Sequence, residues 1–138
     1  MLSRDYIGKV IDAMAKAIAS IAGFKAKGLY EEGIKVLNQV SQQHLKVDLS
    51  LLADVPYSEL IQKLKETEGM NLDLLASTAT CLSLLGDFEI LKSAPKSAQA
   101  HYKQSLVILR YLQKNDLKNY YLARDAEIRR LEESIRQL

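Results

Sequence analysis

Residues 72–86 read Leu-Asp-Leu-Leu-Ala-Ser-Thr-Ala-Thr-Cys-Leu-Ser-Leu-Leu-Gly. Only Asp73 is charged in this stretch, and apolar or small side chains fall on nearly every side of a helix. A helix that is apolar on all sides must be surrounded by protein, and a stretch this short cannot span a bilayer, which needs about 20 residues. The stretch therefore predicts the central, buried helix of an all-helical protein.

The flanking residues predict where this helix begins and ends. Asn71 can cap the first turn with its side chain, and Asp73 lies near the positive end of the helix dipole. Gly86 is expected to end the helix in the left-handed conformation that glycine adopts readily. Cys81 is the only cysteine, which excludes an intramolecular disulfide bond and favours a reducing compartment. We expect it to be a small core residue rather than a nucleophile.

Length and composition indicate one globular domain, residues 1–138. The chain has 48% hydrophobic and 26% charged residues, and its two prolines and six glycines favour a few long helices. A formal net charge of +2 is too small to indicate nucleic acid or an anionic membrane as a partner. The first residues are charged and resemble a helix cap, so we expect neither a signal peptide nor a membrane anchor there. These features together predict a cytoplasmic protein.

Residues 3–46 predict a helical hairpin. Isoleucine and methionine recur at spacings of four and three along the first helix, and Gly28 is expected to end it with a left-handed backbone. A loop this short makes the two helices antiparallel neighbours. A second face of the first helix carries only small residues, which would let another helix approach closely: Gly8, Ala15, Ala19, Ala22 and Ala26. The first helix is therefore expected to be contacted on two sides.

The rest of the chain predicts a connector with one short helix over residues 47–70 and, after the central helix over 72–86, two further helices over 96–114 and 117–138. These last two helices carry more apolar residues than one packing face needs, which gives a candidate interface: Val107, Ile108, Tyr111, Leu131 and Ile135. A second copy of the chain could cover them, because helix seams at this spacing favour a partner helix. The alternative is that the last helix folds back and covers them within one chain.

Two segments resemble the helical hairpins of tetratricopeptide-repeat (TPR) proteins. The first follows that family's order of aromatic, turn glycine, aromatic, small and large apolar residues with Phe24, Gly28-Leu29-Tyr30, Gly33 and Leu37. The second repeats the pattern of small and large residues with Ala79, Leu82, Gly86-Asp87-Phe88, Ala98, Tyr102, Ser105 and Leu106. The resemblance implies an all-α fold of antiparallel helical hairpins, a TPR-like right-handed array of about five to six helices, and a role in protein–protein interaction.

The whole chain also resembles a small group of bacterial TPR-like proteins of unknown function. The shared features are an Asp-Tyr-Ile segment in the first helix, residues 5–7, and a Tyr-Glu-Glu start to the second, residues 30–32. This resemblance implies a bacterial origin and the fold, but no activity. TPR proteins that clamp a C-terminal carboxylate use lysine and asparagine where this chain has Ile18, Ala22, Ala76 and Thr80, so that ligand class is not supported.

Motifs for catalysis or cofactor binding are absent from the sequence. It contains no phosphate-binding loop, dinucleotide glycine motif or zinc-ligand spacing, so we predict no enzyme activity, no cofactor and no metal. His44 and His101 lie far apart in sequence among glutamine and lysine, and are expected to face solvent or to lie at a rim. Four tyrosines on apolar faces or at helix starts are expected in the core: Tyr6, Tyr30, Tyr57 and Tyr102.

Polar side chains on two helices form a candidate interaction groove. One row lies on the central helix and consists of Asp73, Ser77 and Thr80, with Ser83 continuing it. The other is an exposed strip on the first helix, formed by Lys9, Asp12 and Lys16. The alternative for the hydroxyl groups is that they bond back to carbonyls of their own helix.

These features predict a TPR-like scaffold for protein association, either as a homodimer or with an unidentified protein partner, and without nucleic acid or membrane. The alternative is a peripheral membrane-surface module that uses the amphipathic first helix, residues 7–24. An enzyme with an unrecognised site comes third, because no convergent group of polar residues is visible.

Overall fold

A computed structural model describes residues 4–117 and 122–138, and in these ranges the protein is 82% helix and has no strand. Six α-helices follow one another there: α1 (Arg4–Ala26), α2 (Tyr30–Val40), α3 (Leu60–Lys65), α4 (Leu72–Leu91), α5 (Pro95–Asn115) and α6 (Leu122–Arg136). A π-helix, η1 (Ser41–Leu45), and two 3-10 helices, η2 (Leu49–Leu52) and η3 (Tyr57–Glu59), connect α2 to α3. The predicted all-α class is confirmed, while the TPR-like array stays a prediction.

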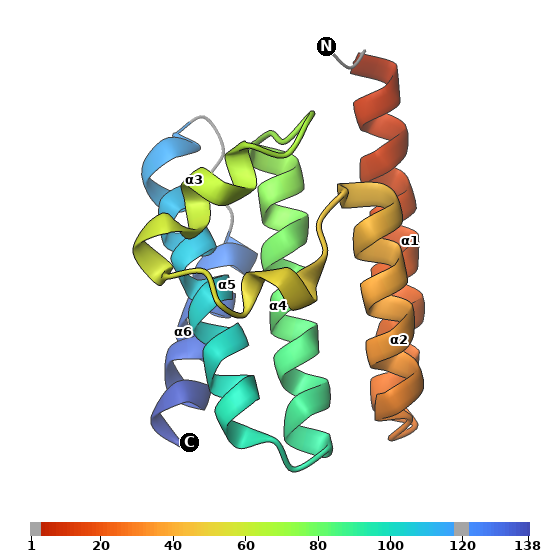
Figure 1. Cartoon of the computed structure of the whole chain (residues 1–138), viewed down its shortest axis with the longest axis vertical. Coiled ribbons are helices and arrows are strands. Elements are labelled where there is room, and N and C mark those ends of the chain that lie inside the picture. Colours follow the sequence, from red (N-terminus) through yellow and green to blue (C-terminus); the bar gives the residue numbers. More distant parts are fainter. Residues whose placement is uncertain (1–3, 118–121) are drawn as a thin grey trace.

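The helices are arranged around α4. Figure 1 shows α4 at the centre, with α1 and α2 on one side and α5 and α6 on the other. α4 contacts α1, α2, α5 and η1, and α6 packs against α5. The stretch 72–86 therefore belongs to the element that joins the two outer pairs of helices.

α4 begins as predicted but ends later than predicted. The Leu74 N–H donates a hydrogen bond of 2.8 Å to Asn71 Oδ1, which confirms the cap. The prediction that Gly86 ends the helix is wrong, because α4 continues to Leu91 and Ser93 takes the left-handed conformation, with φ 63°. Gly86 is buried in mid-helix, where an added Cβ would lie 2.5 Å from Cε1 of Tyr102. Glycine is needed here for the close crossing of α4 and α5, and not for a turn.

The first hairpin forms from α1, α2 and η1. Gly28 has φ 72°, which confirms the predicted left-handed turn. Gly33 in α2 faces the ring of Phe88 in α4 so closely that no Cβ would fit. The rings of Phe88 and Tyr102 thus each pack against a glycine of the neighbouring helix.

Within one chain α1 is packed on one side only, so the expected second contact is not made inside the fold and stays a prediction for a partner. Its large apolar residues face α2 and α4, and Val10, Met14 and Ile21 are buried. Its row of small residues is exposed throughout: Gly8, Ala15, Ala19, Ala22 and Ala26. α1 is therefore an edge helix whose outer face is left uncovered within one chain.

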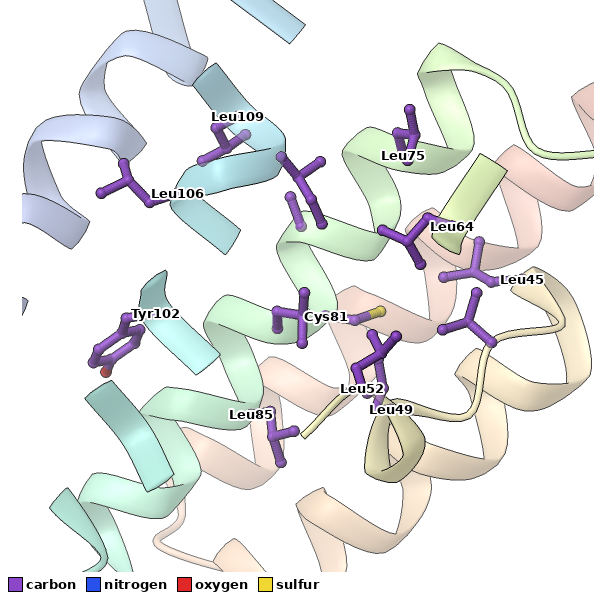
Figure 2. Close-up of a cluster of buried hydrophobic side chains, with 14 of the residues drawn as sticks. Leu45, Leu49, Leu52, Leu64, Leu75, Cys81, Leu85, Tyr102, Leu106 and Leu109 are labelled. Carbon is purple, nitrogen blue, oxygen red and sulfur yellow. The ribbon is translucent and has the colours of Figure 1, made fainter. Parts of the chain in front are cut away.

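The connector between the hairpins completes the core around α4. Figure 2 shows Leu49 and Leu52 beside Cys81, with Leu64 next to Leu45, and all five side chains are buried. The segment 47–70, which was predicted as a connector with one short helix, thus supplies buried side chains to the core. Burial raises the pKa of the Cys81 thiol to about 12, which fits a core residue and not a nucleophile.

The tyrosines are distributed differently from the expectation. Tyr102 is buried and Tyr30 is partly buried, but Tyr6 and Tyr57 are each 43% exposed, so their placement in the core is wrong. A tyrosine near a helix start can pack one edge of its ring and leave its hydroxyl in water.

The C-terminal helices differ slightly from the predicted bounds. α5 starts and ends within one residue of the predicted 96–114. The last helix starts later than residue 117, because Leu117 lies in a turn and α6 begins at Leu122, with residues 118–121 outside the described part. Among the described helices, only α4 is long and apolar enough to cross a membrane, and its most apolar part is mostly buried inside the protein, as in a core helix.

Replacing Leu82 by alanine should lower the free energy of unfolding by about 2 to 5 kcal/mol, because the fully buried side chain leaves a cavity in α4. Urea denaturation followed by circular dichroism would measure this loss. A midpoint equal to that of the wild type would show that the core does not depend on this position.

Replacing Gly86 by alanine should destabilise the protein, although alanine is favoured over glycine inside helices by about 1 kcal/mol. The added methyl group would meet the buried Tyr102 ring. Gly23→Ala in α1 is the matched control, because nothing lies within 4 Å of its Cβ position and the substitution should stabilise. Thermal unfolding of both variants tests the sign. Stabilisation by both substitutions would contradict the close crossing of α4 and α5.

Candidate functional site

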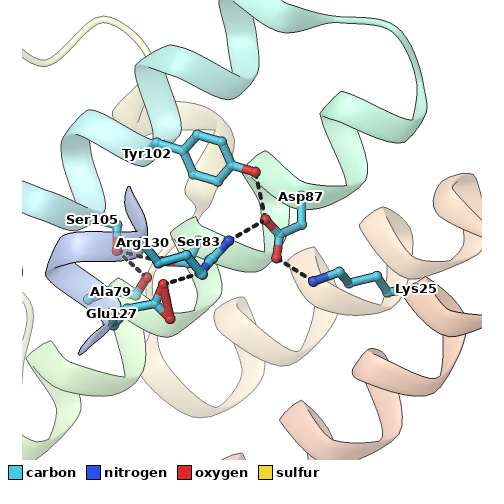
Figure 3. Close-up of polar contacts among 8 residues, drawn as sticks. All are labelled: Lys25, Ala79, Ser83, Asp87, Tyr102, Ser105, Glu127 and Arg130. Atoms are coloured by element: carbon cyan, nitrogen blue, oxygen red, sulfur yellow. Dashed lines mark hydrogen bonds and ion pairs between the residues drawn. The ribbon is translucent and has the colours of Figure 1, made fainter. Parts of the chain in front are cut away.

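One buried carboxylate joins four helices. Asp87 in α4 is 8% exposed and accepts a hydrogen bond of 2.6 Å from the Tyr102 hydroxyl of α5. Lys25 Nζ of α1 lies 2.8 Å from Oδ2, and Arg130 Nη1 of α6 lies 3.2 Å from Oδ1. Figure 3 shows the three side chains converging on Asp87 from different helices. We call these four residues the Asp87 cluster.

Neighbouring groups stabilise the protonated form of Tyr102 and the position of the Arg130 guanidinium in the Asp87 cluster. Burial, and then the hydrogen bond to Asp87, raise the pKa of Tyr102 above its ordinary range. Arg130 also pairs with Glu127 at 2.5 Å, and its guanidinium lies 5.9 Å from the centre of the Tyr102 ring, within cation–π distance. Donors contact both oxygens of Asp87, with Tyr102 and Arg130 at Oδ1 and Lys25 at Oδ2. The chemistry of the cluster is that of a connection between helices.

The Asp87 cluster was not predicted from the sequence. Gly86 was expected to end the central helix, which would have left Asp87 outside it. Helical spacing would not have found the cluster, because Asp87 lies on one line of the helix with Asp73 and Thr80, which are both exposed. Lys25 and Arg130 were not identifiable, since nothing local in the sequence links them to residue 87.

The polar row predicted on α4 is divided in the structure. Ser83 is buried and lies 2.7 Å from Ser105 Oγ, which in turn donates to Ala79 O at 2.7 Å, so this pair connects α4 to α5. Thr80 is exposed and donates to Ala76 O at 3.2 Å, the alternative considered for these hydroxyls. Asp73 is exposed and Ser77 is partly buried.

The remaining predicted groove residues lie on another helix. Lys9, Asp12 and Lys16 are exposed on α1. Within the described residues, no hydrogen bond or ion pair joins this strip to Asp73, Ser77 or Thr80. The structure thus gives two separate polar lines, one on α1 and one on α4.

The candidate interface on α5 and α6 is mostly used within the chain. Ile108 and Leu131 are fully buried, and Val107, Tyr111 and Ile135 are partly buried against the core. α6 packs along α5, and the ammonium of Lys65 lies 4.8 Å from the centre of the Tyr111 ring. The folding back of the last helix therefore accounts for this apolarity, and Ile108 and Leu131 are not available to a partner.

Histidine and acidic residues do not form a metal site in the described part of the chain, where no three potential ligands gather. His101 was expected to face solvent or to lie at a rim, but its side chain is only 13% exposed. Its Nδ1 lies 2.5 Å from Glu89 Oε1, and both side chains are largely buried between α4 and α5. His44 is partly buried in η1, at the rim position that was expected.

Replacing Tyr102 by phenylalanine should lower the free energy of unfolding by about 1 to 3 kcal/mol near neutral pH, because Asp87 loses a buried donor. The raised pKa means that the native state keeps the tyrosine proton after the unfolded state has lost it, at about pH 10. The stabilisation that protonated Tyr102 contributes is complete below about pH 10 and falls at higher pH. The difference in the free energy of unfolding between the wild type and Tyr102→Phe should therefore narrow above about pH 10.

Urea denaturation at neutral and alkaline pH would measure this gap. Tyr57→Phe is the control, because Tyr57 is largely exposed and should show no such narrowing. A gap for Tyr102→Phe that stays constant or widens with pH would rule out the buried, proton-holding tyrosine.

Comparisons with known proteins identified no relative of this chain. No protein-family model matches the chain, and no curated protein and no solved structure matches it either. The resemblance to TPR proteins and to the bacterial TPR-like group therefore stays a prediction.

Proposed function

We propose that this protein is a TPR-like helical scaffold that associates with a second copy of itself through the outer face of α1. The observation that carries the proposal is that this face is left uncovered, although it runs along a helix of 23 residues at the edge of the molecule. Its exposed row of small residues would let a second helix approach closely, since the distance between packed helices depends on the side chains at the contact. A partner helix is the element that best fits such a face.

The charges beside this row favour a second copy as the partner. Asp12 and Lys16 are exposed one helical turn apart, and neither forms an ion pair within the described residues. A twofold axis would set two α1 helices antiparallel and place Asp12 of each chain opposite Lys16 of the other. The face is thus complementary to itself in charge, as an interface between identical subunits has to be.

The distribution of apolar side chains on α1 argues against the membrane-surface alternative. An interfacial helix inserts large apolar side chains into the lipid. Among the described side chains of α1, Val10, Met14 and Ile21 are buried, and those exposed on the outer face are alanine, glycine and polar residues. Co-sedimentation with liposomes would separate the two proposals, because binding to vesicles favours the membrane alternative.

Sedimentation equilibrium of the full chain should show a dimer at about 100 µM protein, the range of a weak specific association. Asp12→Lys and Lys16→Asp should each weaken the dimer, because each places like charges opposite one another. The double variant restores opposite charges and should recover association. Lys63→Glu in α3 is a control away from α1 and should leave the dimer intact.

A wild-type chain that stays monomeric at this concentration would overturn the proposal. Equal association of all the α1 variants would place the interface elsewhere. Circular dichroism of each variant would show that the fold is kept, which is expected because Asp12 and Lys16 are exposed.

A further inference from the structure

A pocket of about 230 Å³ opens where the first turns of α1 meet the end of η1 and the start of α4. Three buried apolar side chains form its inner wall: Val10, Leu45 and Leu74. Four polar side chains among the described residues also line it: Tyr6, His44, Lys46 and Glu68. The pocket thus combines an apolar wall with both acidic and basic groups.

The two opposite charges at this pocket do not neutralise each other. Lys46 and Glu68 both line it, yet no ion pair joins them in the described part of the chain. Lys46 Nζ donates to the backbone carbonyl of Gln43 at 3.1 Å and otherwise remains exposed. The pocket therefore has a cationic and an anionic residue in its lining, and the two do not form an ion pair with each other.

The backbone holds Lys46 in a conformation that lysine seldom adopts. Lys46 has φ 60° and ψ 29°, the left-handed region that glycine and asparagine adopt with less strain. Fully buried Ser41 fixes this turn from the first residue of η1: its Oγ donates to Val47 O at 2.8 Å, and its carbonyl accepts from Val47 N at 3.3 Å. These hydrogen bonds thus fix the backbone turn that places Lys46 at the end of η1.

We propose that this pocket binds a small zwitterion with an apolar body, the class of free hydrophobic α-amino acids. The carboxylate of the ligand is placed at Lys46 and His44, and its ammonium group at Glu68. Its apolar side chain packs on the wall formed by Val10, Leu45 and Leu74. The volume fits a ligand of this size, because it exceeds the roughly 150 Å³ cavity that holds benzene but stays below the roughly 300 Å³ of pockets for larger molecules.

Titration of the 15N-labelled protein with L-leucine, followed by NMR, tests the proposal. Saturable shifts are expected at amides around the pocket, with a dissociation constant on the order of 1 mM or lower. Two matched probes each lack one charge, namely 3-methylbutylamine and 4-methylpentanoate. Each should bind at least about tenfold more weakly than leucine.

Two variants assign the charged contacts. Lys46→Asn removes the ammonium group but keeps a residue that tolerates the left-handed backbone, and Glu68→Gln removes the carboxylate at an exposed position. Each should weaken leucine binding about tenfold. Lys46→Asn should also reduce the preference for leucine over 3-methylbutylamine, which lacks the carboxylate, and Glu68→Gln the preference over 4-methylpentanoate, which lacks the ammonium group. Lys63→Gln, outside this pocket, should bind leucine like the wild type.

The proposal is overturned if leucine causes no saturable shift at the pocket, or if leucine and the two probes bind equally. It is also overturned if Lys46→Asn and Glu68→Gln bind leucine as the wild type does. Backbone NMR spectra of both variants show directly whether the pocket has kept its structure.

Discussion

The fold depends on how the side chain of Tyr102, in α5, packs against α4. Its ring occupies the space that Gly86 leaves open, and its hydroxyl donates to Asp87, one residue further along the same helix. Asp87 in turn holds Lys25 of α1 and Arg130 of α6. This contact therefore brings α4 and α5 close together and places the carboxylate that reaches the outer helices. Because Tyr102 and Asp87 are buried, each would be destabilising without the other.

α1 has three different surroundings along and around its axis. Its inner side belongs to the core, its outer face is exposed, and its first turns form one wall of the pocket that contains Lys46 and Glu68. The Asp87 cluster anchors the opposite end of the helix through Lys25. The proposed dimer contact and the proposed ligand pocket use different sides of this one helix.

Residues of the candidate sites were predictable only where a pattern within one helix identifies them. The exposed strip of Lys9, Asp12 and Lys16 follows from helical spacing and is exposed in the structure. The wall and rim of the pocket come from segments that are distant in sequence, and Lys46 and Glu68 carry no local motif. The apolar residues of α5 and α6 were visible, but their spacing is the same whether the partner is a second copy or the next helix of the chain.

The sequence by itself determined the helices. The charge-free stretch required a buried α4, Asn71 marked its start, and Gly28 marked the first turn, because these signals act between residues that are near in sequence. The tertiary structure decided the meaning of Gly86 and Asp87, since glycine suits both a helix end and a close helix crossing. It also decided which apolar faces are covered. Those outcomes depend on which distant side chains arrive at the same place, and helical periodicity alone does not encode that.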